Sequence, residues 1–315
     1  MKIGIIGAGA VGASTVGQLI QPGGVNPEII LIDQDQKKAV GLAEDFSYAA
    51  ALDSFATVGA GGYDDLVDAG LVIVTAGVNE KDGGATDRND PQGRRRLIPV
   101  NARIYADIIP RVQSAAPGTT VLVITDPPDP LAELARHLAT DLRILSAGTV
   151  IDTLRFRYRI AKKFGVHARE VDATVLGEHG TSSVYLWSSA RVGGVRVLDL
   201  LAQRGDDPAE VQARITEAVR YSNISIIEGI GASQHGIGAV TARIAEAIVR
   251  DEHAIMPVAS HHEEYGTTIS LPSVIGRRGV ERVMCPELTD KERAGLDESA
   301  QVLREAAQTA LDALN

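Results

Sequence analysis

The sequence has very little cysteine, and no cluster of residue types with the spacing of metal ligands. Cys285 is the single thiol among 315 residues. One thiol excludes a disulfide framework and a zinc site built from cysteines. We therefore expect no bound metal, and a protein suited to a reducing cytoplasm.

Long apolar runs are also missing, and acidic residues outnumber basic ones, 41 to 31. No apolar stretch approaches the roughly 20 residues that cross a bilayer. Lys2 and the apolar run after it resemble a signal peptide, but glycines at positions 7, 9 and 12 favour folded structure. The net charge of -10 argues against nucleic-acid binding, and the one obvious basic run, Arg94-Arg95-Arg96, is local. We expect neither a membrane nor a nucleic-acid partner.

What is present is an N-terminal pattern typical of a dinucleotide site. Residues 2–6 form a short apolar strand, and a helical segment follows to about residue 20. Between them Gly7 permits a tight turn, Gly9 lets a pyrophosphate approach the backbone, and Gly12 lets the helix pack on the strand. Ala10 and Val11 complete this G-x-G-x-x-G segment, and we assign all five residues to cofactor binding.

A second apolar strand, residues 28–32, ends in Asp33. This spacing is expected of the carboxylate that accepts hydrogen bonds from the adenosine ribose. A carboxylate there repels a 2′-phosphate, so we predict NAD rather than NADP.

Further apolar runs predict a parallel, doubly wound sheet of six strands. Ligands in such a sheet bind beyond the carboxyl ends of the strands. We therefore expect Thr75, Ala76, Gly77 and Thr125 to border the nicotinamide, and residues 78 to about 93 to form a mobile lid. The four further runs are 56–58, 71–74, 121–124 and 144–146.

The pattern changes near residue 149. The predicted fold class is α/β: an N-terminal Rossmann domain over residues 1–149 and a C-terminal α+β substrate domain over residues 150–315. In the second part we expect strands at 171–176 and 183–192, helices at 208–230, 237–250 and from Thr289 to near Leu314, and a hairpin pairing 268–271 with 280–284.

Three polar residues of the second part suggest proton chemistry on a carboxylate. Asp152 and Arg155 share one face if the segment after residue 149 is helical. A carboxylate can orient a histidine, and a guanidinium can hold a substrate carboxylate bidentately. His179 stands between Gly177 and Gly180, and histidine exchanges protons near neutral pH because its reference pKa is ~6.5. A surface ion pair and a packed loop histidine are the alternatives.

Five motifs in order resemble the lactate/malate dehydrogenase family, on the lactate dehydrogenase side, over nearly the whole chain. That resemblance implies an NAD-dependent 2-hydroxycarboxylate dehydrogenase that moves a hydride between NAD(H) and C2 of a small carboxylate, in a homo-oligomer, dimer or tetramer. The motifs are Gly7-Ala-Gly-Ala-Val-Gly12, Thr75-Ala-Gly77, Ile151-Asp-Thr-Leu-Arg-Phe-Arg157, Gly177-Glu-His-Gly180 and Ser270-Leu-Pro-Ser-Val-Ile-Gly276.

The resemblance also implies roles for single residues. His179 would be the acid/base, Asp152 would orient it, and Arg155 would clamp the carboxylate. An arginine from the lid would polarise the substrate carbonyl. Arg94 lies seven residues before Asn101, and this spacing resembles that of the family, in which the residue matching Asn101 lies close to the cofactor. The segment 86–90 also resembles the family's lid sequence, and it would make Arg88 the lid arginine. We favour Arg94.

Two departures from the family bear on the substrate. Asp126 stands where the family has an asparagine that donates a hydrogen bond, and an ionised aspartate cannot donate. Three explanations are open. Asp126 is protonated, or it faces a cationic substrate nitrogen, as in an imine reductase. In the third, its charge impairs keto-acid chemistry, as in a non-catalytic NAD-binding sensor. Ser233, beside Gly231 and Ala232, lines the predicted side-chain pocket and favours a substituent bulkier than methyl.

Overall fold

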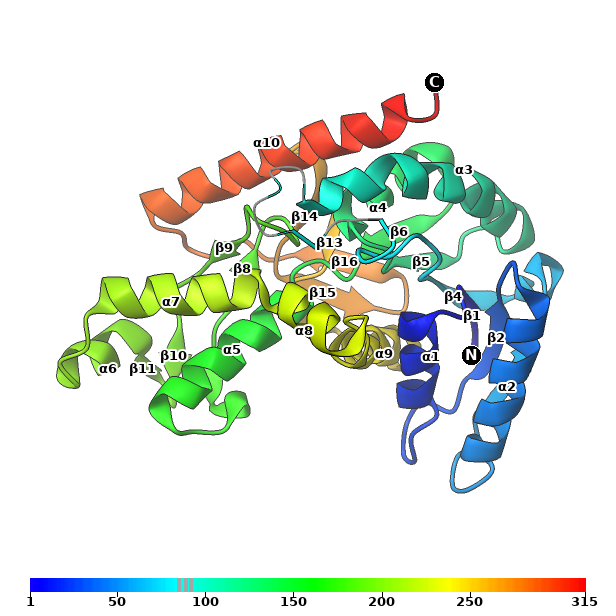
Figure 1. The fold of residues 1–315 in the computed structure, drawn as a ribbon, viewed down its shortest axis with the longest axis horizontal. Coiled ribbons are helices and arrows are strands. Elements are labelled where there is room, and N and C mark those ends of the chain that lie inside the picture. Colours follow the sequence, from blue (N-terminus) through cyan, green and yellow to red (C-terminus); the bar gives the residue numbers. More distant parts are fainter. Residues whose placement is uncertain (84–85, 88–89, 91–92) are drawn as a thin grey trace.

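The structure is a computed structural model that describes residues 1–83, 86–87, 90 and 93–315. One eight-stranded sheet forms its centre, with strand order β14-β13-β6-β5-β4-β1-β2-β3 (Figure 1). The six strands of the first half are parallel, and the order reverses between β1 and β4, as the prediction of a doubly wound sheet requires. They are β1 (Lys2–Ile6), β2 (Glu28–Ile32), β3 (Thr57–Ala60), β4 (Ala69–Val74), β5 (Thr120–Val123) and β6 (Arg143–Ser146).

Helices cover both faces of this sheet because successive strand residues point in opposite directions. Ile5 packs into one apolar core and Ile6 into the other. The first core takes residues from α1 (Ala10–Leu19), α2 (Gln36–Ala50) and α9 (His235–Arg250). The second takes them from α3 (Ile98–Ala115), α4 (Pro128–Leu138) and α10 (Asp290–Asp312), which lie together at the top of Figure 1.

Two strands of the second half extend the sheet. β13 (Ala259–His262) pairs antiparallel with β6 and with β14 (Thr267–Ser270). The predicted hairpin between 268–271 and 280–284 was therefore wrong: β15 (Ser273–Gly276) pairs with β16 (Gly279–Val283) instead, since the two residues between them allow a tight reversal. The sheet thus crosses residue 149, and the domain division proposed there stays a prediction.

The rest of the second half packs around its own apolar core, which contains Phe156 and Leu201. The helix predicted over 208–230 is two helices, because the backbone leaves helical geometry at Tyr221 and the Ser222 hydroxyl bonds back to the Val219 carbonyl. The strands predicted over 171–176 and 183–192 are each broken. The elements are α5 (Val150–Phe164), α6 (Val197–Gln203), α7 (Pro208–Arg220), α8 (Ser222–Ile230), β7 (Val171–Asp172), β8 (Val175–Leu176), β9 (Val184–Tyr185), β10 (Arg191–Val192), β11 (Val195–Arg196) and β12 (Ala254–Met256).

The final helix begins as predicted. Thr289 caps α10, and its hydroxyl and the Glu292 side chain satisfy each other's backbone N–H groups in a capping box. Short 3-10 helices lie at η1 (Tyr63–Leu66), η2 (Gly93–Leu97) and η3 (Ala168–Glu170). In the described part of the chain, no helix is both long and apolar enough to cross a membrane.

Candidate active site

The glycine segment forms a cradle at the carboxyl end of β1. Gly7 has a φ of 110°, and a Cβ there would lie 2.6 Å from the Ala76 nitrogen. A Cβ on Gly12 would overlap the Gly7 carbonyl oxygen, so this position admits no side chain. A Cβ on Gly9 would meet nothing within 4 Å. Gly9 therefore faces the open side of the turn, above the N-terminus of α1, where a phosphate group fits.

Asp33 lies at the end of β2 beside this cradle. Its Oδ2 accepts the Ala8 N–H at 2.7 Å, and its Oδ1 accepts the Asp35 N–H at 2.9 Å. Each carboxylate oxygen keeps a further lone pair. Asp33 is thus held rigidly and can still accept from two ribose hydroxyls, so the chain's residues fit a dinucleotide.

The ends of β4 and β5 are fastened to this cradle and to each other. The Thr75 hydroxyl donates to the Gly7 carbonyl at 2.9 Å, and the Thr125 hydroxyl donates to the Ala76 carbonyl at 2.8 Å. Asn101, wholly buried on α3, accepts from the backbone N–H of residue 78 and donates to the Asp126 carbonyl, both at 2.8 Å. These predicted cofactor residues therefore fix the strand ends at the site, and Thr75, Gly77 and Thr125 line its cavity.

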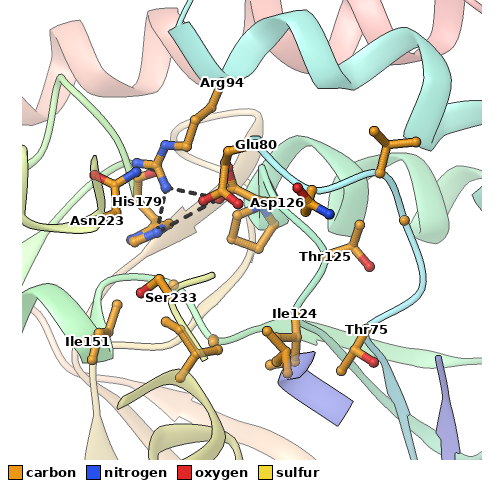
Figure 2. Close-up of a pocket in the computed structure, with 18 of the residues that line it drawn as sticks. Thr75, Glu80, Arg94, Ile124, Thr125, Asp126, Ile151, His179, Asn223 and Ser233 are labelled. Atoms are coloured by element: carbon orange, nitrogen blue, oxygen red, sulfur yellow. Dashed lines mark hydrogen bonds and ion pairs between the residues drawn. The ribbon is translucent and has the colours of Figure 1, made fainter. Parts of the chain in front are cut away.

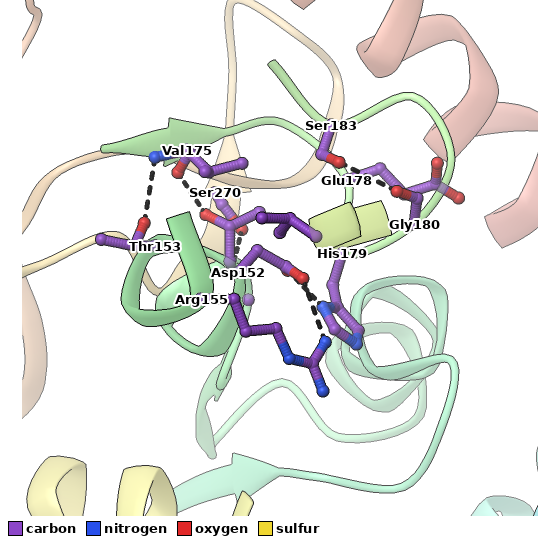
Figure 3. A network of polar contacts seen from close by, with 12 residues as sticks. Asp152, Thr153, Arg155, Val175, Glu178, His179, Gly180, Ser183 and Ser270 are labelled. Atoms are coloured by element: carbon purple, nitrogen blue, oxygen red, sulfur yellow. Dashed lines mark hydrogen bonds and ion pairs between the residues drawn. The ribbon is translucent and has the colours of Figure 1, made fainter. Parts of the chain in front are cut away.

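The three polar residues predicted in the second half come together in the structure. Asp152 and Arg155 lie on α5, and His179 lies in the loop between β8 and β9 (Figure 3). His179 Nδ1 is 2.5 Å from Asp152 Oδ2, and Arg155 donates from Nη1 to Asp152 Oδ1 at 3.4 Å. All three side chains are mostly buried. The carboxylate acceptor favours the tautomer with the proton on Nδ1, which leaves Nε2 facing the cavity.

Asp152 stays ionised in this setting. Burial on its own would raise the pKa of this carboxyl, but its interactions with His179 and then with the Arg155 charge outweigh burial and lower the pKa. An ionised Asp152 can stabilise a positive imidazole ring when His179 takes up a proton.

Arg94 reaches the same point from η2. It donates from Nη1 to Asp126 Oδ1 at 2.9 Å and lies 2.7 Å from His179 Nε2, and its Nη2 donates to the His179 carbonyl at 3.1 Å (Figure 2). Burial alone would lower the pKa of this guanidinium, but the Asp126 and Glu80 carboxylates raise it. Arg94 is therefore a fixed positive charge beside His179 Nε2. Arg88, the other candidate, lies outside the described residues.

Asp126 sits in an arrangement that the three sequence-based explanations did not include. Its Oδ1 is paired with Arg94, so its charge is opposed within the protein. Its Oδ2 is buried and has no hydrogen-bond partner among the described residues. Oδ1, the oxygen that pairs with Arg94, lies 3.9 Å from His179 Nε2, so the carboxylate stands beside the cavity-facing nitrogen of the histidine.

The sequence interpretation missed two acids of the site. Glu80 lines the cavity, where burial, and then the charge of Asp126, raise the pKa of its carboxyl. Asp129 is wholly buried; it accepts the His179 backbone N–H at 2.8 Å and the Ser146 hydroxyl at 2.6 Å, and burial raises its pKa to about 6. Both follow strand ends closely in sequence, which is the signal that could have found them.

The cavity draws its walls from both halves of the chain. Arg155 Nη2 lies 3.5 Å from the Ser233 hydroxyl, so the predicted carboxylate clamp and the predicted pocket residue are neighbours. The Asn223 side chain also reaches the cavity. Its apolar lining includes Val11, Ile124, Ile151 and Ile237.

Comparison with known proteins agrees with this geometry. The model of the lactate/malate dehydrogenase NAD binding domain matches residues 1–143, and that of the lactate/malate dehydrogenase alpha/beta C-terminal domain matches residues 149–313. The L-lactate dehydrogenase of Deinococcus radiodurans is 41% identical over 96% of this chain and 97% of its own length. That of Thermus aquaticus is 39% identical over 98% of each.

A solved structure points the same way. The crystal structure of a lactate dehydrogenase from a Medee basin deep-sea metagenome library is 32% identical, covers 98% of both chains and has a TM-score of 0.88. The chain therefore belongs to the lactate/malate dehydrogenase family and is an NAD-dependent 2-hydroxyacid oxidoreductase of the lactate dehydrogenase type.

Proposed function

We propose that this chain interconverts a 2-hydroxy and a 2-oxo carboxylate, with His179 exchanging the proton at the C2 oxygen. The observation that carries the proposal is the 2.5 Å contact between His179 Nδ1 and Asp152 Oδ2, which leaves Nε2 directed at the cavity. NAD, when bound, takes or returns the hydride. The names of the relatives point to lactate and pyruvate as the first pair to test.

Each neighbouring residue has a proposed task. Arg155, beside Ser233, holds the substrate carboxylate as a planar fork. Arg94 polarises the C2 oxygen and stabilises the negative charge that develops there. Its ion pair with Asp126 keeps the guanidinium in place.

The cofactor is proposed to lie along the strand ends. Gly7, Gly9, Ala10, Val11 and Gly12 would receive the pyrophosphate, and Asp33 the ribose. On the nicotinamide side the proposed neighbours are Thr75, Ala76, Gly77, Asn101 and Thr125. The open side of Gly9 and the remaining acceptor sites of Asp33 support this placement.

Small residues support a substituent larger than methyl on C2. Ser233 lines the cavity with a short side chain, and it follows the small residues Gly231 and Ala232 just after α8. The Asp126 oxygen without a partner favours one rival, reduction of an imine, in which that oxygen would face a nitrogen cation.

The test is NADH oxidation with a panel of 2-oxo acids, from pyruvate and oxaloacetate to branched and aromatic ones, with and without ammonia or methylamine. Turnover of an oxo acid without amine supports the dehydrogenase and sizes the pocket. Turnover only with amine supports the imine reductase, and NADH binding without turnover supports a sensor.

We also propose a homo-oligomer, a dimer or a tetramer. Leu52 and Phe55, just after α2, are each 89% exposed, and Tyr48 on α2 is 68% exposed. Large apolar side chains that are exposed and this close in the chain favour a subunit contact. Sedimentation velocity should give at least twice the mass of 33.2 kDa, and a monomer would contradict the proposal. The cytoplasmic location stays a prediction.

A further inference from the structure

The charges of the cavity do not balance pairwise. Arg94 pairs with Asp126 at 2.9 Å, and Arg155 with Asp152 at 3.4 Å. Glu80 also lines the cavity, but within the described residues it forms no ion pair at 4.0 Å or less. Arg94 acts on Glu80 only through its charge, because its side chain is paired with Asp126. When a substrate carboxylate occupies Arg155, Glu80 therefore has no ion-pair partner of its own among the described residues.

Glu80 lines the cavity on a different side of His179 from Ser233, the neighbour of Arg155 (Figure 2). Figure 2 shows it beside Asp126 and facing Arg94, whereas Ser233 lies on the other side of His179. Ser233 marks the clamp, because its hydroxyl is 3.5 Å from Arg155. With the substrate carboxylate at the clamp and the C2 oxygen at His179, the substituent on C2 extends toward Glu80.

Resting on the function proposed above, we propose that Glu80 is a specificity residue that selects substrates with a positive charge on the C2 substituent. The substrate class is a 2-hydroxy or 2-oxo carboxylate whose side chain carries an amine or a guanidine. Such a cation pairs with Glu80 in a partly buried site, where an ion pair is stronger than in water. A second substrate carboxylate meets Glu80 and Asp126 and is repelled.

The surroundings of Glu80 favour the approach of a cation. Burial and the charge of Asp126 raise the pKa of its carboxyl, and they outweigh a backbone hydrogen bond and the charges of Arg94 and His179, which lower it. A carboxylate in that condition gains from any cation placed beside it. A neutral methyl group on the substrate would give the Glu80 carboxylate no such stabilisation.

The experiment compares 2-hydroxy acids that differ in side-chain charge: L-lactate, L-3-amino-2-hydroxypropanoate, L-4-amino-2-hydroxybutanoate and L-malate. Each is oxidised with NAD+ at pH 7.5, and L-alanine is added as a substrate with nitrogen at C2. We expect kcat/KM for one of the amino-hydroxy acids to exceed that for lactate about tenfold and that for malate about a hundredfold or more.

The variant Glu80→Gln keeps the shape of the side chain and removes its charge. The preference for the amino-hydroxy acid over lactate should fall about tenfold or more, and the rejection of malate should weaken. Asp82→Asn is the matched control, because Asp82 belongs to the same segment and is exposed outside the cavity, and it should change neither ratio. NADH binding checks that each variant is folded.

The outcomes separate this inference from the function it rests on. A wild-type enzyme that oxidises lactate or malate faster than both amino-hydroxy acids overturns the role of Glu80 and leaves the dehydrogenase intact. The same holds if Glu80→Gln leaves the ratios unchanged. Oxidation of alanine instead of any 2-hydroxy acid, or of no compound at all, overturns both.

Discussion

Replacement of Asp152 by asparagine tests how far its carboxylate supports the proton exchange at His179. At the observed 2.5 Å, two unit charges at an effective dielectric constant of 20 attract each other by ~7 kcal/mol. Arg155 lies 3.4 Å from the other oxygen and offsets part of that charge. We therefore expect Asp152→Asn to lose about 3–5 kcal/mol of transition-state stabilisation, a fall in kcat of roughly 10²–10⁴.

Asparagine adds a second effect in the same direction. Its amide group can donate to Nδ1 and place the ring proton on Nε2, which is the wrong tautomer for accepting the hydroxyl proton of the substrate. The assay is NAD+ reduction with the best 2-hydroxy acid, and NADH binding should change less than about threefold. Asp172→Asn, an acid of the same half that is 83% exposed, should leave kcat within about twofold. A kcat of Asp152→Asn within about threefold of wild type would refute the proposed role of Asp152.

Three further predictions follow from the same geometry. Asp129 has a pKa raised to about 6, so its contribution to stability is largest below about pH 4 and is lost as the pH rises through 6. In urea titrations, the free energy of unfolding of wild type should fall by up to ~3 kcal/mol relative to that of Asp129→Asn between pH 4 and 7. An equal pH dependence of the two proteins would contradict this. Arg155→Lys should lower kcat/KM about 10²–10³-fold, because the bidentate grip is lost, and NADH affinity should stay the same; an intact kcat/KM would exclude the clamp. Gly9→Ala should keep the melting temperature of the free protein but weaken NADH binding at least tenfold. Gly12→Ala should instead lower the melting temperature, because its Cβ would overlap the Gly7 carbonyl oxygen. Equal melting temperatures of the two variants would show that the Gly12 contact is not tight.

Most of the fold could be predicted because its signals are local. The strand, glycine turn and helix at residues 2–20 follow one another in sequence, and the apolar runs mark the parallel strands. The pairing of β13 with β6 could not be predicted, because it joins Ala259 to Ser146 across more than a hundred residues and no local pattern encodes it. The break at Tyr221 was missed because the apolar periodicity continues across it.

The residues of the site also differ in how far the sequence could predict their positions. His179, Asp152 and Arg155 carry the resemblance to the family, so their meeting could be expected. Glu80 and Asp129 belong to none of the quoted motifs, and their importance comes from burial and from neighbours that only the folded chain supplies. The pairing of Arg94 with Asp126 was not foreseen either, because it joins residues 32 positions apart and no local pattern encodes it.

The central claim is that hydride leaves C2 of a 2-hydroxy acid while His179 takes the hydroxyl proton. The most direct test uses the best substrate deuterated at C2, with NAD+ and with either wild type or His179→Gln. We expect one deuterium in each NADH formed by wild type, and a rate at least about 10³-fold lower for the variant at unchanged NADH affinity. NADH without deuterium, or undiminished turnover by His179→Gln, would contradict it.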